Sequence, residues 1–197
     1  MCNLYRLDPS QKIFDFTPAD IQQFNVPVDV YPTYPGLVVE GRKLKRMTWG
    51  IPMHFKGKAK PAPVNNARGD RLRTLWRVPF ERRRLLIPVS QWAEAQGEKG
   101  RMTKTWCSVP GQAPFMVAGI WNPSVEWGDS YSMVMTDSSP QIAHIHDRMP
   151  VILAPEHYAQ WTEGTPEEAF ALVRPWDGPI AVDATAELWS ARRKPAV

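Results

Sequence analysis

Short apolar runs recur along the chain, alternate with polar residues, and end at proline, glycine, asparagine or aspartate. This pattern is typical of half-buried and fully buried β-strands. It predicts eight short strands, at Leu37–Glu40, Arg46–Ile51, Leu85–Val89, Lys104–Val109, Phe115–Trp121, Tyr131–Thr136, Met149–Leu153 and Ile180–Val182.

Helix signals are fewer. Thr17 and Thr165 are each followed by proline, with an acidic residue three positions on, which indicates a capped helix start. The expected helices cover residues 17–24, 155–161 and 165–173, and a fourth covers 71–77, where Leu72, Leu75 and Trp76 share one face. Because strands predominate and helices do not alternate with them, we predict an α+β fold. It would be a single domain over residues 1–197, with a curled, barrel-like, mainly antiparallel sheet, a few short helices and a flexible tail of about ten residues.

Composition is ordinary for a globular protein, with 43% hydrophobic and 22% charged residues among 197. No apolar stretch approaches the length of a membrane span, and the N-terminus has no signal-peptide pattern. Two cysteines cannot build a disulfide framework or a four-thiolate zinc site. We therefore expect a cytoplasmic monomer, nucleoid-associated if bacterial, with no metal, no cofactor and no membrane partner.

Positive charge is concentrated in one segment. Residues 41–84 contain fourteen Lys and Arg but only two acidic residues, a local charge of +12 in a chain whose net charge is +4. Such a concentration is typical of a protein that binds a polyanion, and nucleic acid is the preferred interpretation. A solvated basic surface, neutralised by acidic residues that lie close in space, is the alternative.

Familiar enzyme signatures are absent from the sequence: there is no phosphate-binding glycine loop, nucleophile elbow or zinc-binding histidine motif. The residue with distinctive chemistry is Cys2. Removal of Met1 would leave an α-amine and a thiol on one residue, and the amine, with a pKa near ~7.7–8.0, is partly neutral at physiological pH. An amine and an adjacent thiol convert an aldehyde into an imine and then a thiazolidine. An inert cysteine at a frayed terminus is the alternative.

Six short motifs, taken together and in this order, resemble the SOS-response-associated peptidase (SRAP) family. They are Met-Cys at the start, Trp49-Gly50-Ile51-Pro52, Asn66-Ala67-Arg68, Ile87-Pro88 with Glu94 six residues later, Ala118-Gly119-Ile120-Trp121, and His146-Asp147-Arg148-Met149-Pro150.

The resemblance implies a protein that senses abasic sites in single-stranded DNA and forms a thiazolidine crosslink to them, a lyase-like activity, after removing its own Met1. It implies Cys2 as the nucleophile and Asn66 as a holder of the Cys2 backbone or the opened sugar. It also implies Glu94 as the proton carrier for the α-amine and His146 as an acid–base on the sugar hydroxyl.

By the same resemblance, Arg68 and Arg148 would hold phosphates beside the lesion, and Arg71 would extend that track. Trp49 would offer a stacking face for a neighbouring base, although a core tryptophan is the alternative. Pro32 would wedge against a flanking base.

The sequence departs from the family pattern in two places. Asn3-Leu4 stands where many members have Gly-Arg, so one phosphate contact is expected to be missing or moved to Arg6. Alanines flank Glu94, with Trp92 two residues before it, where an aromatic residue usually precedes the acid and a tryptophan follows it.

Two other functions fit part of this pattern. One is a conventional cysteine peptidase that acts on other proteins through Cys2 and His146, which gives no reason for the basic segment. The other is a non-covalent module for single-stranded DNA in which Cys2 is inert.

Overall fold

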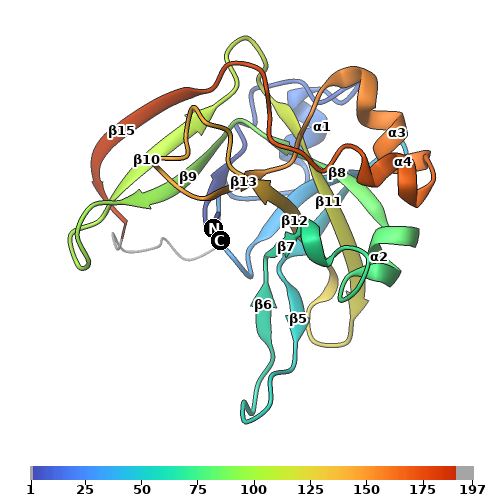
Figure 1. The fold of residues 1–197 in the computed structure, drawn as a ribbon. Helices are drawn as coiled ribbons and strands as arrows, with labels where there is room; N and C mark the ends of the chain where they lie inside the picture. Colours follow the sequence, from blue (N-terminus) through green and yellow to red (C-terminus); the bar gives the residue numbers. More distant parts are fainter. Residues whose placement is uncertain (1, 190–197) are drawn as a thin grey trace.

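The computed structural model describes residues 2–189, and five of their strands close into a barrel (Figure 1). These strands are β3 (Pro35–Glu40), β4 (Lys43–Trp49), β8 (Arg84–Val89), β11 (Phe115–Ser124) and β12 (Gly128–Asp137). They follow the order β4, β3, β8, β11, β12, and β12 then returns to β4 in the one parallel pairing of the ring. The predicted α+β class and barrel-like, mainly antiparallel sheet are confirmed.

The barrel strands β3 and β8 and the first six residues of β11 are buried on both faces, which is why their sequences read as nearly continuous apolar runs. β4 instead alternates buried residues with partly or fully exposed ones. In β8, Leu85, Ile87 and Val89 belong to one core, while Leu86 between them belongs to a second. Successive side chains of a strand point to opposite faces, so one strand supplies both cores. The first core also receives the N-terminal segment, and the second receives the helices.

A five-stranded antiparallel sheet packs on the first core. It comprises, in spatial order, β15 (Ala181–Leu188), β10 (Thr103–Ser108), β9 (Gln91–Gln96), β1 (Tyr5–Arg6) and β2 (Asp29–Val30). Tyr5 of β1 pairs with Trp92 of β9, and Cys107 of β10 pairs with Trp92 from the other side. All three side chains are buried in the same core as Met133 of the barrel. This sheet therefore fixes the N-terminal residues against the barrel.

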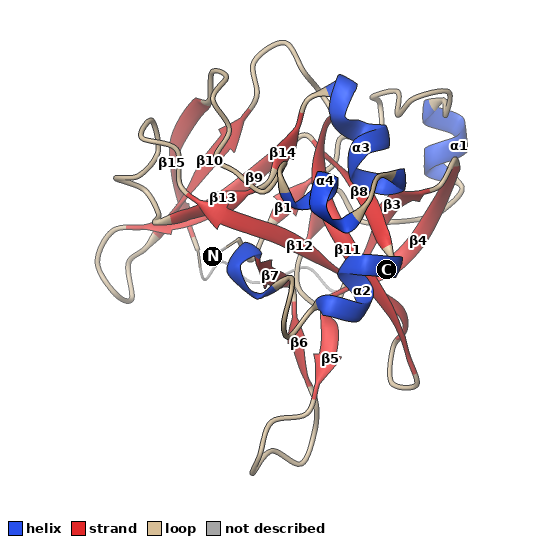
Figure 2. Ribbon diagram, turned by 45° about the vertical axis from the view of Figure 1, so that its right-hand side comes forward, coloured by secondary structure: helices blue, strands red, loops and turns tan. Residues whose placement is uncertain are grey.

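Shorter strands extend the barrel. β7 (Asn66–Arg68) and β13 (Arg148–Pro150) both pair with the second half of β12, and β14 (Ile152–Leu153) pairs with β11. β5 (Ile51–Met53) and β6 (Ala62–Val64) pair with each other and form a hairpin that projects from the body of the protein (Figures 1 and 2). One end of this hairpin follows β4 and the other leads into β7.

The helices gather on the side of the barrel away from the five-stranded sheet (Figure 2). Thr17 and Thr165 cap two of them as predicted, each accepting a hydrogen bond from the backbone N–H three residues on. Ile21, Phe80 and Trp161 from these helices are buried in the second core. The helices are α1 (Pro18–Gln22), η1 (Gly69–Arg71), α2 (Arg77–Arg82), η2 (Pro155–His157), α3 (Tyr158–Glu163) and α4 (Pro166–Phe170).

Three details of the predicted elements were wrong. Residues 72–76 form turns rather than a helix, α2 begins only at Arg77, and Leu75 is exposed although its spacing indicated a buried face. Glu94, which falls outside the eight predicted strands, lies within β9. The short strand expected at 180–182 begins at residue 181 and continues to residue 188 as β15. Most of the predicted tail lies outside the described residues.

Arg84 belongs to the basic segment but is buried inside the protein. Its guanidinium donates hydrogen bonds to the carbonyl oxygens of Phe80, Trp161 and Gly164. It thereby joins the end of α2 to α3 and to the residue that follows α3. Burial lowers its pKa, and the three carbonyl acceptors satisfy a cation that would otherwise be costly to bury.

Gly36 in β3 leaves room for two buried tyrosines. The hydroxyls of Tyr5 and Tyr131 are hydrogen-bonded to each other, and a Cβ at position 36 would overlap both oxygens. Tyr5 also makes an edge contact with Trp49, with ring centroids 4.9 Å apart. The absence of a side chain at Gly36 therefore allows β1 to pack closely against the barrel.

We expect Gly36→Ala to lower the free energy of unfolding by about 3 kcal/mol, because the added methyl group overfills a packed core. Gly41→Ala is the control: its φ is +59° and nothing lies within 4 Å of the added Cβ, so backbone strain alone should cost roughly 1 kcal/mol. Urea denaturation measures both. An equal or smaller loss in Gly36→Ala would contradict the packing explanation.

Candidate active site around Cys2

Cys2 is completely buried, three residues before β1 begins. The backbone N–H of Ala93 donates to the carbonyl oxygen of Leu4 at 2.9 Å, extending the pairing of β1 with β9 toward the N-terminus. The Cys2 Sγ lies 3.4 Å from the same Leu4 oxygen. The five-stranded sheet thus holds the cysteine inside the protein.

Two adjacent asparagines bind the backbone of Cys2. The side-chain amides of Asn65 and Asn66 donate to the carbonyl oxygen of Cys2 at 2.8 Å and 2.7 Å. Both residues are buried, and Asn66 begins β7, where it pairs with Met133. Sequence reasoning singled out Asn66 and missed Asn65, although the doubled asparagine was a visible signal.

Glu94 lies on β9, opposite Thr105 of β10, and only 3% of it is exposed. Burial, together with the negative charge of Asp147, raises its pKa from 4.5 to about 7. Burial and the negative charge of Glu94 also raise the pKa of the Cys2 thiol well above its ordinary value. The carboxyl group can therefore gain or lose a proton near neutral pH, while the resting thiol stays protonated.

His146 lies in the segment just before β13, with about a quarter of its side chain exposed. Its Nδ1 accepts a hydrogen bond from the backbone N–H of Arg148 at 3.0 Å. Asp147 Oδ1 is also 2.9 Å from Nδ1, but a nitrogen that accepts the Arg148 hydrogen cannot donate to a carboxylate at the same time. Burial lowers the pKa of His146, so the neutral ring carries its proton on Nε2.

Trp49 does not provide the predicted stacking face. It is fully buried, its indole N–H donates to the backbone oxygen of Asn65 at 3.0 Å, and its ring contacts Tyr5. The core alternative is correct, and Trp49 instead supports the asparagine that binds Cys2. Pro32 lies in a partly exposed turn, in which the N–H of Thr33 donates to the backbone oxygen of Trp49.

Arg68, Arg71 and Arg148 lie near the end of β12, because β7 and β13 both pair with that strand. Arg68 makes two hydrogen bonds to the carboxylate of Asp70, at 2.7 Å and 3.0 Å. Arg71 lies 3.9 Å from the same carboxylate, and Arg148 lies 3.7 Å from Asp137. The structure thus brings together the three arginines predicted to bind phosphate, and each of them lies close to the carboxylate of an aspartate.

Arg6 is not a free phosphate contact. Its guanidinium pairs with Asp29 at 2.7 Å and lies over the ring of Trp106, 4.2 Å from the ring centroid. These contacts join β1 to β2 and β10, which gives Arg6 a structural role in the five-stranded sheet.

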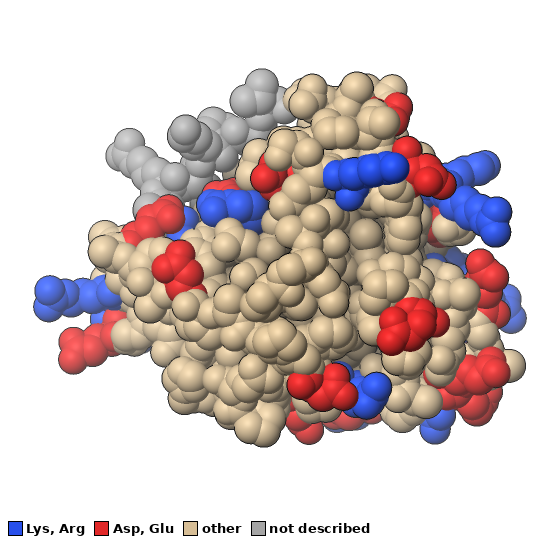
Figure 3. Space-filling model, turned by 90° about the horizontal axis from the view of Figure 1, so that it is seen from above, with Lys and Arg blue, Asp and Glu red and all other residues tan. Residues whose placement is uncertain are grey.

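The projecting β5–β6 hairpin carries a second group of basic residues. Lys56, Lys58 and Lys60 are exposed in its loop, and Phe55 beside them is 48% exposed. Where this loop begins, just after β5, His54 pairs with Glu126 at 2.9 Å. Figure 3 shows the protein from the opposite end, where the centre of the face is largely uncharged and charged side chains lie around its edge.

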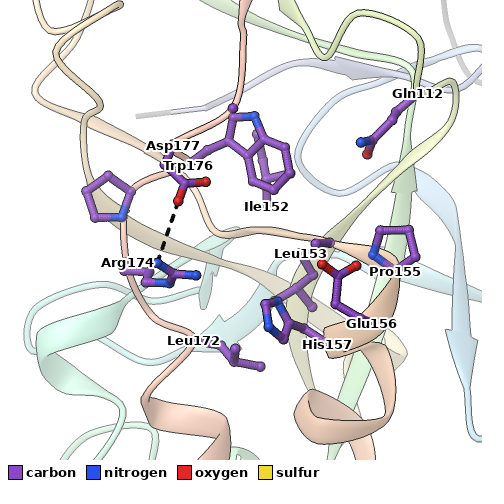
Figure 4. Close-up of a pocket in the computed structure, with 13 residues that line it drawn as sticks. Gln112, Ile152, Leu153, Pro155, Glu156, His157, Leu172, Arg174, Trp176 and Asp177 are labelled. Atoms are coloured by element: carbon purple, nitrogen blue, oxygen red, sulfur yellow. Dashed lines mark ion pairs between the residues drawn. The ribbon is translucent and has the colours of Figure 1, made fainter.

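A pocket of about 340 Å³ lies elsewhere, between β14, η2 and residues 172–178 (Figure 4). Trp176 forms one wall of it, and Arg174 and Asp177 form an ion pair of 3.8 Å at its rim. None of the predicted site residues lines this pocket. Within residues 2–189, no three His, Cys, Asp or Glu side chains are grouped so as to hold a metal ion. Over the same part of the chain, no helix is long and apolar enough to cross a membrane.

The family model for SOS response associated peptidases matches residues 1–186. The chain belongs to this family. The match contains every residue predicted for the site, and the SRAP resemblance read from the six motifs is confirmed. Among curated proteins, none is similar enough to count as a relative.

Solved structures share the SRAP fold described above. A protein from Bordetella bronchiseptica has a TM-score of 0.76 and 23% identity over 93% of this chain and 99% of its own. A protein from Bacteroides thetaiotaomicron has a TM-score of 0.70 and 19% identity over 84% and 82%. A phage-related protein from Bordetella bronchiseptica has a TM-score of 0.64 and 17% identity over 93% of each chain. At these identities the likeness concerns the fold.

The raised pKa of Glu94 predicts a pH-dependent stability of this SRAP protein. Because the folded protein favours the protonated carboxyl group, the free energy of unfolding should fall as the pH rises from 4.5 to about 7. Glu94→Gln should remove this fall and be more stable than the wild type at pH 8 by roughly 1–3 kcal/mol. Urea denaturation at pH 5 and pH 8 measures the difference. The exposed Glu98→Gln is the control, and an unchanged pH dependence in Glu94→Gln would contradict the assignment.

Proposed function

We propose that the protein senses abasic sites in single-stranded DNA and bonds to them through Cys2 after removal of Met1, shielding the lesion during the response to DNA damage. The observation that carries this proposal is the environment of Cys2. Two asparagine amides hold its carbonyl oxygen, and a carboxyl group with a pKa of about 7 is buried in β9 beside the same segment. Family membership supports the coarser statement, a peptidase-like protein associated with the SOS response.

The proposed reaction begins at the α-amine of Cys2. The neutral amine attacks the C1′ aldehyde of the ring-opened abasic sugar, forming a carbinolamine that loses water to give an imine. The Cys2 sulfur then adds to the imine carbon, and its proton passes to the nitrogen, which closes the thiazolidine. The DNA is therefore joined to the protein with the loss of one water molecule.

Glu94 is suited to carry the protons of this reaction. A carboxyl group with a pKa of about 7 is present in both forms at neutral pH. As a carboxylate it takes a proton from the attacking amine, and as an acid it returns that proton to the departing hydroxyl. Glu94 is also close enough to Cys2 to raise the pKa of its thiol, and we assign it the same proton-carrying role in the removal of Met1.

His146 and Asn66 are suited to the sugar. With Nδ1 accepting the Arg148 N–H, the neutral His146 ring offers Nε2–H as a donor to the sugar oxygen during ring opening. Asn66 Oδ1 is buried and has no hydrogen-bond partner within the described residues, so it offers an acceptor for the Cys2 amine or an opened-sugar hydroxyl.

The state of the Cys2 thiol argues against a conventional cysteine peptidase. Such an enzyme needs a thiolate, which a nearby cationic histidine stabilises. Here burial and Glu94 raise the pKa of the thiol, and burial lowers the pKa of His146. These shifts favour a mechanism in which the amine reacts first and the thiol follows.

Two basic surfaces would bind the DNA backbone. The first is the arginine group at the end of β12, where phosphates would displace the aspartate partners of Arg68 and Arg148. The second is the β5–β6 hairpin loop, whose lysines and exposed Phe55 suit a single strand with unstacked bases. The partly exposed Pro32 keeps its proposed place beside a flanking base, and a monomer suffices for this reaction.

Cys2→Ser should abolish the stable adduct, because serine keeps the amine but cannot form a thiazolidine. Intact-mass spectrometry after incubation with a single-stranded oligonucleotide containing one abasic site measures the product, which equals protein plus DNA minus water. The matched control is Cys107→Ser, which changes the other buried cysteine and should crosslink like the wild type. A heat-stable adduct in Cys2→Ser would reject the mechanism. Tight binding without any wild-type adduct would favour the non-covalent module.

Binding of undamaged single-stranded DNA should weaken steeply with salt, because each neutralised phosphate releases counterions. Arg68→Ala should reduce the slope of log affinity against log salt by about 0.7, the value for one phosphate on a single strand. Fluorescence anisotropy between low and physiological salt measures it. Arg174→Ala removes an exposed, ion-paired arginine of the pocket in Figure 4 and should leave the slope unchanged. Equal slopes in all three proteins would contradict the assignment of Arg68.

A further inference from the structure

The donors of Asn65 are both directed at the N-terminal segment. An asparagine amide nitrogen carries two hydrogens, and in Asn65 this nitrogen lies 2.8 Å from the Cys2 oxygen and 3.1 Å from Asn3 Oδ1. One side chain therefore binds two consecutive residues at the start of the chain.

The position of Asn65 is itself fixed from the barrel. Its backbone oxygen accepts hydrogen bonds from the indole of Trp49 and from the N–H of Met133, each at 3.0 Å. Trp49 is fully buried, and Met133 lies in the middle of β12. The amide of Asn65 is consequently held in place from behind and cannot follow the N-terminal segment if that segment moves.

The carbonyl oxygen of Cys2 has two lone pairs, and Asn65 and Asn66 supply one donor for each. With both donors in place, rotation of this carbonyl would break a buried hydrogen bond. The orientation of the Cys2 α-carbon, and hence of its amine and thiol, is fixed as a result. Both N–H groups also point their positive ends at Cys2, the residue that carries the amine, and there they disfavour an added positive charge.

We propose that Asn65 is a second positioning residue of the Cys2 site, which together with Asn66 orients the α-amine and keeps it neutral once Met1 has been removed. This role rests on the proposed function, in which the neutral amine is the attacking group. The other ionisable groups packed around the N-terminal segment are Glu94 of β9, Cys107 of β10, Tyr5 of β1, Tyr131 of β12, and His146 and Asp147 before β13.

The α-amine can be titrated directly, because the chain has only two cysteines to label. Proteins carrying ¹³C- and ¹⁵N-labelled cysteine, released from a fusion cut directly before Cys2, would be followed by NMR across pH 5 to 10. Asn65→Leu keeps the approximate size of the side chain but loses both donors. We expect it to raise the midpoint of the titration of the α-amine by about 0.2–0.7 pH unit. Asn65→Asp should raise it further, because it places an acceptor and a negative charge at the same position.

Asn122→Ala is the matched control. It removes the side chain of an asparagine on β11 that accepts a hydrogen bond from Arg83, and it should leave the titration midpoint of the α-amine unchanged. A purely structural role would lower the amount of folded protein without moving the midpoint. If Asn65→Leu does not fold, the nearly isosteric Asn65→Asp decides. A folded Asn65 variant with the wild-type midpoint overturns the proposal.

The same proteins, incubated with the abasic oligonucleotide, separate this proposal from the proposed function. If both hold, the crosslinking rate of Asn65→Leu falls more at pH 6.5 than at pH 8.5. If the midpoint moves but the wild type forms no crosslink, the crosslinking function fails while the effect of Asn65 on the amine stands. A third outcome is that the wild type crosslinks, and that both Asn65 variants have the same amine midpoint and the same pH profile of crosslinking as the wild type. In that case Asn65 has no positioning role.

Discussion

The hydrogen bonds from Asn65 and Asn66 to the carbonyl oxygen of Cys2 join the first residues of the chain to the barrel. A chain terminus ordinarily frays, because few contacts offset the conformational entropy of ordering it. Here Asn66 begins a strand that pairs with β12, and Tyr5 continues the same N-terminal segment into the five-stranded sheet. The remaining features of the site depend on this attachment, since a mobile cysteine would have neither a fixed orientation nor a dry environment.

Burial acts on three ionisable groups in the same chemical direction. It raises the pKa of the Cys2 thiol and of Glu94, and it lowers the pKa of His146. Each shift favours the uncharged form, because a low dielectric penalises charge of either sign. At neutral pH the site therefore holds a neutral thiol, a neutral imidazole and a carboxyl group close to its midpoint. Such a set is suited to moving protons between neutral partners, which is what addition of an amine to an aldehyde requires.

The sequence was most informative where a local rule decides the structure. The helix starts at Thr17 and Thr165 follow from capping, and the β8 run follows from burial on both faces. The prediction for Leu75 was wrong because helical spacing occurs there in a run of turns. The strand that contains Glu94 was missed because it is stabilised by pairing with β1 and β10, which lie far from it in the sequence or beyond a loop. The contact between Asn65 and Cys2 spans more than sixty residues, so the doubled asparagine marks the residue but no local pattern identifies Cys2 as its partner.

The same distinction applies to charge. The sequence places fourteen cations in residues 41–84, but the fold uses them differently. Arg84 binds backbone carbonyls in the interior, and Arg68 already binds a carboxylate. The hairpin lysines are exposed in a loop whose two strands continue directly into Trp49 and Asn65, the residues that support Cys2. A polyanion bound by this loop would therefore be connected to the Cys2 site through the short β5–β6 hairpin. The location of the basic residues in the fold, more than their number, is what links the basic segment to Cys2.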